Sequence, residues 1–257
     1  MKRLKIGLFG FGRTGKIVAE QIINDNELEL IWVARKSLTN TRTFASSMMG
    51  NNDKFAPCFS IKEISSDFFN EYPVDVIIDF SSETGIDFYQ DSCKSGIKVV
   101  NAISHYSESQ LEKLHEMSKQ TSILYSPNIT IGINFLIVVS KVLKQIAPDA
   151  DIEIVEEHFR DKQGISGTAL RIAEDLDLCK NKQINSIRVG GIVGIHEVIF
   201  GLPNQTIRIK HEAINRGAFG LGAIYAAKWL SEKDSGIYTM EDVIRLSFIE
   251  NIRSVEI

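Results

Sequence analysis

The sequence predicts a two-part α/β protein, in which a parallel sheet with flanking helices precedes a smaller α+β part that carries a mixed sheet. Short apolar runs alternate with amphipathic segments in the first half, as in β-α-β units. After Pro127 the pattern changes to alternating polar and apolar residues, typical of strands with one exposed face. A chain of 257 residues accommodates two modest domains. We expect a first domain at 1–127 and 218–257, and a second at 128–217.

Local patterns place the elements of the first part. Apolar runs bounded by turn residues predict strands at residues 4–9, 28–34, 74–80, 98–100 and 123–125. Amphipathic segments between them predict helices at 13–23, about 83–95 and 108–119. The last of these helices should begin with a capping box, because Ser107 and Gln110 have the required spacing. The polar stretch 37–53 is expected to be a loop with at most one helical turn.

The second part begins with a predicted helix at 135–146. Alternating segments then predict the strands of the mixed sheet, at 151–158, 186–189, 192–200 and 205–211. Two further helices are expected at 221–230 and 239–246. We expect these C-terminal helices to return to the first domain.

Composition and charge exclude several classes of function. Lys and Arg total 29 against 33 Asp and Glu, and the net charge of -4 argues against a general nucleic-acid binder. No apolar run approaches membrane-spanning length. Cys58, Cys93 and Cys179 lie far apart and outside metal-ligand spacings, so we expect three buried thiols and no metal site. A cytoplasmic protein with no membrane and no nucleic-acid partner is predicted.

A glycine-rich turn, Gly10-Phe11-Gly12-Arg13-Thr14-Gly15, joins the first predicted strand to the first predicted helix. In this context the pattern is typical of a Rossmann domain that binds a dinucleotide. The glycines let the backbone approach a pyrophosphate, whose charge is stabilised by the helix N-terminus. We therefore expect contacts with the cofactor from Gly10, Phe11, Gly12, Arg13 and Thr14. The alternative is a glycine turn that serves packing alone.

The end of the second strand indicates which dinucleotide binds. Sites for NAD usually carry a carboxylate there, whereas the 2'-phosphate of NADP requires cations. The sequence reads Ala34-Arg35-Lys36-Ser37, with two cations, a hydroxyl and no carboxylate. We expect Arg35 and Lys36 to contact NADPH, and NADH to bind more weakly. The alternative is that both are solvated loop charges.

Residues 157–168 concentrate groups suited to acid/base chemistry and anion binding. His158 can donate or relay a proton near neutral pH. Arg160 and Lys162 bring positive charge. Ser166-Gly167-Thr168 precedes a helix predicted to begin near Ala169, so its free N–H groups suit a carboxylate. Together these residues predict a site for an anionic substrate.

Further motifs extend this pattern along the chain. The run Val76–Ser81 ends in Asp-Phe-Ser, Ser126–Asn134 reads Ser-Pro-Asn-Ile-Thr-Ile-Gly-Ile-Asn, and related segments lie at 188–200, 207–211 and 236–238. With the glycine-rich turn and the segment 151–169, these motifs resemble, in order and over nearly the whole chain, the 4-hydroxy-tetrahydrodipicolinate reductases (dihydrodipicolinate reductases) of the diaminopimelate and lysine pathway.

The resemblance implies an oxidoreductase with a Rossmann domain and an α+β domain whose sheet builds a homotetramer. It also implies that His158 acts as acid/base, that Lys162 is the proton donor and that the Ser-Gly-Thr turn holds a substrate carboxylate. The residues expected at the substrate are Phe159, Arg160, Ser166, Gly167 and Thr168. Further cofactor contacts are expected at Phe80, Asn101, Ala102, Ile103, Ser126, Pro127, Asn128 and Ile129.

The sequence departs from this family at three places. Phe159 replaces a second histidine, the loop before Ser166 is shortened, and Asn101–Ser104 replaces a Gly-Thr-Thr-Gly segment. The leading hypothesis is NADPH-dependent reduction of 4-hydroxy-tetrahydrodipicolinate to tetrahydrodipicolinate. The alternatives are a paralogue that reduces another cyclic imine or dicarboxylate, and a non-catalytic NADPH-binding regulator.

Overall fold

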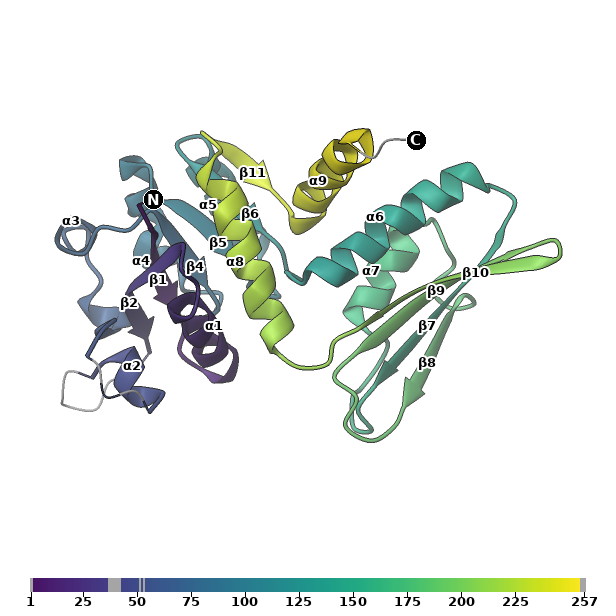
Figure 1. The fold of residues 1–257 in the computed structure, drawn as a ribbon, viewed down its shortest axis with the longest axis horizontal. Helices are drawn as coiled ribbons and strands as arrows, with labels where there is room; N and C mark the ends of the chain where they lie inside the picture. The colour runs from purple at the N-terminus through teal and green to yellow at the C-terminus, as the bar shows by residue number, and fades with distance from the viewer. Residues whose placement is uncertain (1, 37–42, 51, 53, 255–257) are drawn as a thin grey trace. The chain divides into compact units, whose positions relative to one another are not determined.

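The computed structural model describes residues 2–36, 43–50, 52 and 54–254 (Figure 1). These residues form two compact units. The first consists of the described parts of Met1–Thr130 and Phe219–Val243, and the second of Ile131–Ala218 with the described part of Ile244–Ile257. The sequence analysis assigned all of 218–257 to the first domain. In the structure the described residues 244–254 group with the second unit, where Phe248 forms an edge contact with Phe135 at 5.9 Å between ring centroids.

A parallel sheet forms the centre of the first unit, as predicted (Figure 1). Its strand order is β11-β6-β5-β4-β1-β2-β3, and every neighbouring pair is parallel. The strands are β1 (Leu4–Phe9), β2 (Leu28–Arg35), β3 (Cys58–Ser60), β4 (Val76–Asp79), β5 (Lys98–Asn101), β6 (Ser122–Tyr125) and β11 (Gly236–Tyr238). The order reverses between β1 and β4, and in such sheets ligands bind at the carboxyl ends of the strands at this point.

Helices connect these strands. They are α1 (Arg13–Ile23), α2 (Ala45–Met48), α3 (Phe68–Glu71), α4 (Ile86–Tyr89), α5 (Glu108–Ser118) and most of α8 (Gly217–Ser231), with 3-10 helices η1 (Ile61–Glu63) and η2 (Gln90–Ser95). The predicted capping box of α5 is present. The helix predicted at about 83–95 is instead divided into α4 and η2, and it ends at Gly96 in the left-handed conformation (φ +78°).

Aromatic rings fill the core of the first unit. Trp32 packs so closely over β1 that a Cβ on Gly7 would lie 2.2 Å from its ring, so only glycine fits there. Trp32 also contacts Phe9 and Phe68 edge to face.

The sequence predicted that all three cysteines are buried. This prediction is correct for Cys58 and Cys93 and wrong for Cys179, which belongs to the second unit and is exposed.

The second unit contains the predicted mixed sheet, in the order β10-β9-β7-β8. Only the pairing of β7 with β8 is parallel. Its strands are β7 (Asp151–His158), β8 (Ile184–Arg188), β9 (Ile195–Leu202) and β10 (Gln205–Glu212), and its helices are α6 (Ile131–Ile146), α7 (Gly167–Asp175) and most of α9 (Met240–Ser254).

Alternation along β7 and β9 separates the two faces of this sheet. Ile152, Ile154, Val198 and Phe200 form a core with α6 and α7 on one face (Figure 1). The opposite face presents the exposed Ile187 and, beside it on β7, the carboxylate of Glu157.

Among the described residues, no helix is both long and apolar enough to cross a membrane.

Candidate active site

The glycine-rich turn lies at the carboxyl ends of β1 and β4. Gly10 has a φ of +93°, and a Cβ there would lie 2.7 Å from the carbonyl oxygen of Phe80. A Cβ on Gly15 would lie 2.1 Å from the carbonyl oxygen of Gly10. In contrast, a Cβ on Gly12 would meet nothing within 4 Å. Gly10 and Gly15 therefore allow the strand and the helix to pack closely, and Gly12 leaves the backbone before α1 accessible.

The N-terminus of α1 is suited to an anion. Gly12 is its N-cap residue and supplies no side-chain hydrogen bond, and the first turn contains no acidic residue. Arg13 is exposed beside it, Thr14 is half-buried and Phe11 is buried. Helix N–H groups without side-chain partners are the groups that bind phosphate in dinucleotide sites. The residues predicted to hold a pyrophosphate therefore fit it.

Arg35 ends β2, next to the glycine-rich turn in the sheet. It is half-buried, and its guanidinium donates to the sulfur atom of Met48 at 3.2 Å. Lys36 follows and is exposed. The predicted hydroxyl of Ser37 lies outside the described residues. Both predicted cations therefore stand at the strand end where the adenosine ribose of a dinucleotide is expected.

A buried polar network lies beneath the neighbouring strand ends. Asp79, the last residue of β4, accepts hydrogen bonds from the backbone N–H and the hydroxyl of Ser81 at 2.8 and 2.6 Å. It also accepts one from the Tyr89 hydroxyl at 2.8 Å. Burial raises the pKa of Asp79 to about 6, although the hydrogen bonds from Ser81 and Tyr89 oppose the increase.

Asn101, which the sequence analysis predicted to contact the cofactor, belongs to the same network through its side chain. Its side-chain amide donates to the hydroxyls of Tyr89 (2.8 Å) and Tyr106 (2.6 Å), and its carbonyl oxygen accepts from the N–H of Ile103 (3.1 Å). The side chain is completely buried, so its hydrogen-bonding groups face the protein interior. Asn101 therefore orients the loop that continues through Ala102 rather than presenting its amide at the surface.

The segment after β6 is also held by its own hydrogen bonds. The Ser126 hydroxyl donates to the carbonyl of Asn128 at 2.8 Å, and the Asn128 side chain accepts from Thr130. Ser126 and Ile129 are buried, whereas Pro127 is exposed and Asn128 half-buried. Of the predicted contacts in this segment, Pro127 and Asn128 are the residues accessible to a ligand.

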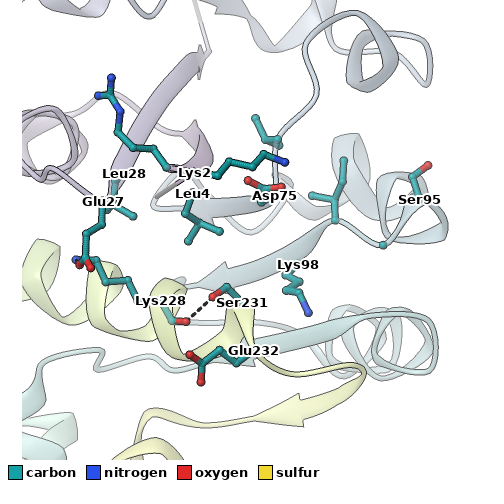
Figure 2. A pocket seen from close by; sticks show the side chains of 14 residues that line it. Lys2, Leu4, Glu27, Leu28, Asp75, Ser95, Lys98, Lys228, Ser231 and Glu232 are labelled. Atoms are coloured by element: carbon teal, nitrogen blue, oxygen red, sulfur yellow. Dashed lines mark hydrogen bonds and ion pairs between the residues drawn. The ribbon is translucent and has the colours of Figure 1, made fainter.

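The first unit also contains a cavity of about 570 Å³, which Figure 2 shows at close range. It lies at the amino ends of β1, β2 and β5, the edge of the sheet opposite to the glycine-rich turn. Lys228 in its wall pairs with Asp25 at 2.8 Å and Glu27 at 2.5 Å, and Lys98 donates to the carbonyl of Lys233. Ligands of such sheets bind at the carboxyl ends of the strands, so this cavity at their amino ends does not have the position of a dinucleotide site.

In the second unit, the carboxylate of Glu156 contacts two of the residues that the sequence analysis predicted for the site, His158 and Ser166. Glu156 on β7 is completely buried. Its Oε1 atom accepts hydrogen bonds from the backbone N–H of Ser166 (3.2 Å), the hydroxyl of Ser186 (2.6 Å) and the guanidinium of Arg188 (2.5 Å). Its Oε2 atom accepts from Arg188 at 2.9 Å and lies 2.5 Å from Nδ1 of His158.

These contacts keep Glu156 ionised. Burial alone would raise its pKa, but the hydrogen bonds from Arg188, Ser186, His158 and Ser166 prevail and lower the pKa to about 2. Arg188 forms a two-pronged pair with the carboxylate, the strong geometry for this kind of interaction. Glu156 therefore stays negatively charged at neutral pH, and the positive charge of Arg188 balances it.

His158 lies at the end of β7 with only 7% of its surface exposed. Burial lowers its pKa; Glu156 opposes that effect, and the positive charges of Lys162 and Arg188 add to it. A Cβ on Gly194 would lie 3.1 Å from Nε2 of His158, so the absence of a side chain there leaves space at this nitrogen. At neutral pH the imidazole is therefore uncharged, with Nδ1 directed at Glu156.

The Ser-Gly-Thr turn begins α7, two residues before the position that the sequence predicted. Ser166 is its buried N-cap, and its hydroxyl oxygen lies 2.9 Å from Nε2 of His196. Gly167 is exposed, with no atom within 4 Å of the position of a Cβ, and Thr168 is half-buried. The first residue of α7, Gly167, therefore has open space beside it.

Arg188 also holds the loop between His158 and Ser166. Its guanidinium donates to the carbonyl of Lys162 at 3.1 Å and to that of Gly164 at 2.6 Å. Lys162 itself is half-buried, Arg160 is exposed and Phe159 is 44% exposed. The structure thus brings the predicted residues of this segment to one end of the sheet, with the two charged side chains and Phe159 accessible.

Sequence reasoning assigned no role to Glu156, Ser186 or Arg188, and for His196 it expected a structural residue or one near the substrate pocket. One signal was present: Glu156 occupies an inward position in the alternation of β7, between Ile154 and His158. A carboxylate at a core position requires partners. Those partners come from β8 and β9, which local pattern does not connect to β7.

Comparison with known proteins finds a family match for each of the two units. Residues 4–129 match the family "Dihydrodipicolinate reductase, N-terminus", and residues 130–244 match "Dihydrodipicolinate reductase, C-terminus". The chain is 34% identical over 256 residues to a 4-hydroxy-tetrahydrodipicolinate reductase of Caldanaerobacter subterraneus, with 91% of this chain and 95% of the relative covered. It is 30% identical over 249 residues to that of Thermosipho africanus, with 96% and 100% covered.

Solved structures share the fold. A dipicolinate-bound dihydrodipicolinate reductase from Paenisporosarcina sp. TG-14 superposes with a TM-score of 0.76 at 18% identity, over 94% of this chain and 99% of the other. An engineered D-amino acid dehydrogenase bound to NADP+ gives a TM-score of 0.60 at 12% identity, with all of both chains covered. The two matched family segments together span residues 4–244, and the relatives match over nearly their full length; the chain is therefore a member of the dihydrodipicolinate reductase family of oxidoreductases.

Proposed function

We propose that the protein is an NADPH-dependent reductase that converts 4-hydroxy-tetrahydrodipicolinate to tetrahydrodipicolinate in the diaminopimelate and lysine pathway. The observation that carries this proposal is the buried cluster of Glu156, His158 and Ser166 at the start of α7, with Lys162 beside it. Relatives with the same family segments are named for this activity. A cytoplasmic location is part of the proposal.

The first unit would hold the cofactor. Gly10 and Gly12 form a backbone cradle, the N-terminus of α1 would bind the pyrophosphate, and Arg35 with Lys36 would pair with the 2'-phosphate. When bound, NADPH supplies the hydride. Phe80 and the backbone of Ala102 and Ile103 would line the nicotinamide end, because they follow β4 and β5 at the carboxyl edge of the sheet.

The second unit would hold the dicarboxylate substrate and supply the proton. The N-terminus of α7 at Gly167 and Thr168, with the Ser166 hydroxyl, would bind one carboxylate, and Arg160 would bring charge to the other. The ammonium group of Lys162 would donate the proton that balances the hydride, and the 4-hydroxyl group of the substrate would leave as water. His158 would accept and return a proton at Nε2, with Glu156 stabilising its charged form.

A homotetramer is the proposed assembly. The second sheet has α6 and α7 on one face, whereas Ile187 is exposed and Val155 and Ile199 are half-buried on the other. Apolar side chains in the middle of an uncovered sheet face favour association with another protein surface. Sedimentation of the purified protein would measure the oligomeric state.

One observation favours a second candidate function. Phe159 places a 44% exposed aromatic ring beside Lys162, where the family pattern has a second histidine. An apolar group at this position suits a cyclic imine with an apolar part, reduced by the same hydride chemistry. A non-catalytic regulator has less support, because the Glu156–His158 pair and Lys162 serve no evident purpose in nucleotide binding.

The deciding experiment measures NADPH oxidation with freshly prepared product of the condensation of aspartate semialdehyde and pyruvate, beside a panel of other cyclic imines. We expect the highest kcat/KM with this lysine precursor. A higher value with another imine would establish the paralogue. Tight NADPH binding without turnover of any imine would favour the regulator.

A further inference from the structure

Glu156 contacts both the residue proposed to transfer protons and the residue proposed to bind substrate, and it is completely buried. Its Oε2 atom lies 2.5 Å from Nδ1 of His158, the residue proposed to transfer protons. Its Oε1 atom accepts the N–H of Ser166, the residue proposed to bind a substrate carboxylate. Because Glu156 has no exposed surface and both of its oxygens are occupied by donors of the protein, it does not contact substrate itself.

The geometry determines where the proton of the neutral imidazole resides. An ionised carboxylate only accepts hydrogen bonds, so His158 must carry its proton on Nδ1 to donate to Glu156. The second nitrogen, Nε2, then has a free lone pair. It faces the space that Gly194 leaves open, where a Cβ would approach Nε2 to 3.1 Å.

We infer that Glu156 is a positioning residue, which fixes the tautomer and the ring orientation of His158 so that Nε2 is presented as a proton acceptor. This inference rests on the proposed function for its catalytic consequence, but the tautomer itself does not. Histidines in catalytic and metal sites are commonly fixed in this way by a hydrogen bond to the other ring nitrogen.

The surroundings explain why the charge stays on Glu156. Arg188 from β8 donates to both carboxylate oxygens, and Ser186 donates to one of them. The groups that face His158 besides Glu156 are Lys162 in the loop, Arg188 on β8 and His196 on β9, whose ring centroid is 5.3 Å away. All of these disfavour an imidazolium or are neutral, so Glu156 is the group that supports the charged form.

Glu156→Gln is the informative variant. Three donors, from Ser166, Ser186 and Arg188, converge on the Oε1 position, so the amide oxygen of Gln should occupy it. The amide NH2 would then lie at the Oε2 position, where it would lose the hydrogen bond from Arg188 and donate to Nδ1 of His158. The proton of the imidazole would move to Nε2, which would convert the acceptor into a donor. This variant therefore inverts the tautomer with little change in side-chain volume.

The experiment records nitrogen-15 spectra of the histidines at pH 7.5 together with steady-state kinetics with the lysine precursor. In the wild type, we expect the Nδ1–H tautomer at His158. In Glu156→Gln we expect the Nε2–H tautomer, a decrease in kcat of about a hundredfold or more, and unchanged affinity for NADPH. Glu174→Gln, at an exposed position of α7, is the control and should match the wild type in every measurement.

The outcomes separate this inference from the proposed function. An Nε2–H tautomer in the wild type would overturn the inference without requiring any variant to fold. Wild-type turnover by Glu156→Gln with an inverted tautomer would overturn the positioning role. If the wild type shows the Nδ1–H tautomer but does not reduce the lysine precursor, the proposed function fails and the assignment of Glu156 stands.

Discussion

Nε2 of His196 lies 2.9 Å from the hydroxyl oxygen of Ser166, and both side chains are buried. No described residue is within hydrogen-bonding distance of Nδ1 of His196. Burial lowers the pKa of His196 to about 3, so the ring is neutral. A proton on Nδ1 would be a buried donor without a partner, whereas a proton on Nε2 has Ser166 to bind. His196 therefore donates to Ser166, which leaves the serine hydroxyl proton for a substrate carboxylate.

This relationship predicts that His196→Phe weakens substrate binding. Without the donor, the Ser166 hydroxyl loses its orientation, and a hydrogen bond to a charged group contributes about 1.5 kcal/mol or more. We expect KM for the dicarboxylate to rise about tenfold, with unchanged affinity for NADPH. A double-mutant cycle with Ser166→Ala checks the coupling. Additive effects of the two substitutions would show that His196 does not act through Ser166.

Lys162→Ala should decrease turnover and leave cofactor affinity intact. Lys162 lies close enough to His158 to influence its pKa, and it belongs to the second unit, whereas the glycine-rich turn belongs to the first. Loss of a proton donor lowers rates by about a hundredfold or more. Kcat and the Kd for NADPH are to be measured beside Lys182→Ala, an exposed lysine of the same unit. Normal kcat in Lys162→Ala would assign the proton to another group.

Arg35→Glu should reverse the preference between cofactors. The guanidinium at the end of β2 would pair with the 2'-phosphate of NADPH, and a carboxylate there would repel it and accept from the ribose hydroxyls of NADH. We expect NADPH affinity to fall at least tenfold and NADH affinity to rise. Titration of both cofactors measures this. Lys119→Glu, an equal charge change at the end of α5, is the control. Equal wild-type affinities for the two cofactors would refute the preference.

Asp79 predicts a distinctive dependence of stability on pH. Burial raises its pKa from 3.8 to about 6 in the folded state. As pH rises from about 4 to 6, the unfolded chain ionises first, so the free energy of unfolding decreases, by at most about 3 kcal/mol. Above pH 6 this contribution is constant. Asp79→Asn should lack the decrease, which urea unfolding of both proteins at pH 4, 5 and 6.5 would reveal. Parallel pH profiles would contradict a raised pKa.

Phe159→His distinguishes the two candidate substrates. If the lysine precursor is the substrate, the introduced imidazole adds a polar contact, and catalytic efficiency should stay equal or increase. If Phe159 packs against an apolar part of another imine, the substitution leaves an unpaired polar group at about 1 to 3 kcal/mol, a five- to hundredfold loss. Both substrates are to be assayed with both proteins. A loss with the lysine precursor would remove the support for that substrate at this position.

Local pattern was sufficient for the main elements of this chain. It predicted the bounds of β1, α1 and β7 as the structure has them, because each is an uninterrupted apolar or amphipathic run between clear turn signals. The short β3 and α3 were not predicted, since three or four residues carry too little periodicity. Tertiary packing decided those elements.

The sequence by itself determined the family, the dinucleotide turn and the candidates His158, Lys162 and Ser166, because these features lie in contiguous motifs. Only the tertiary structure decided how they are connected. The register of the second sheet places Ser186 and His196 opposite Glu156 from two different strands. The hydrogen bonds of Glu156 to Ser186 and Arg188 join residues 30 or more positions apart in the sequence. Local sequence patterns do not show which strands will pair, so they could not predict these bonds. The buried carboxylate that orients the site is therefore a product of the fold.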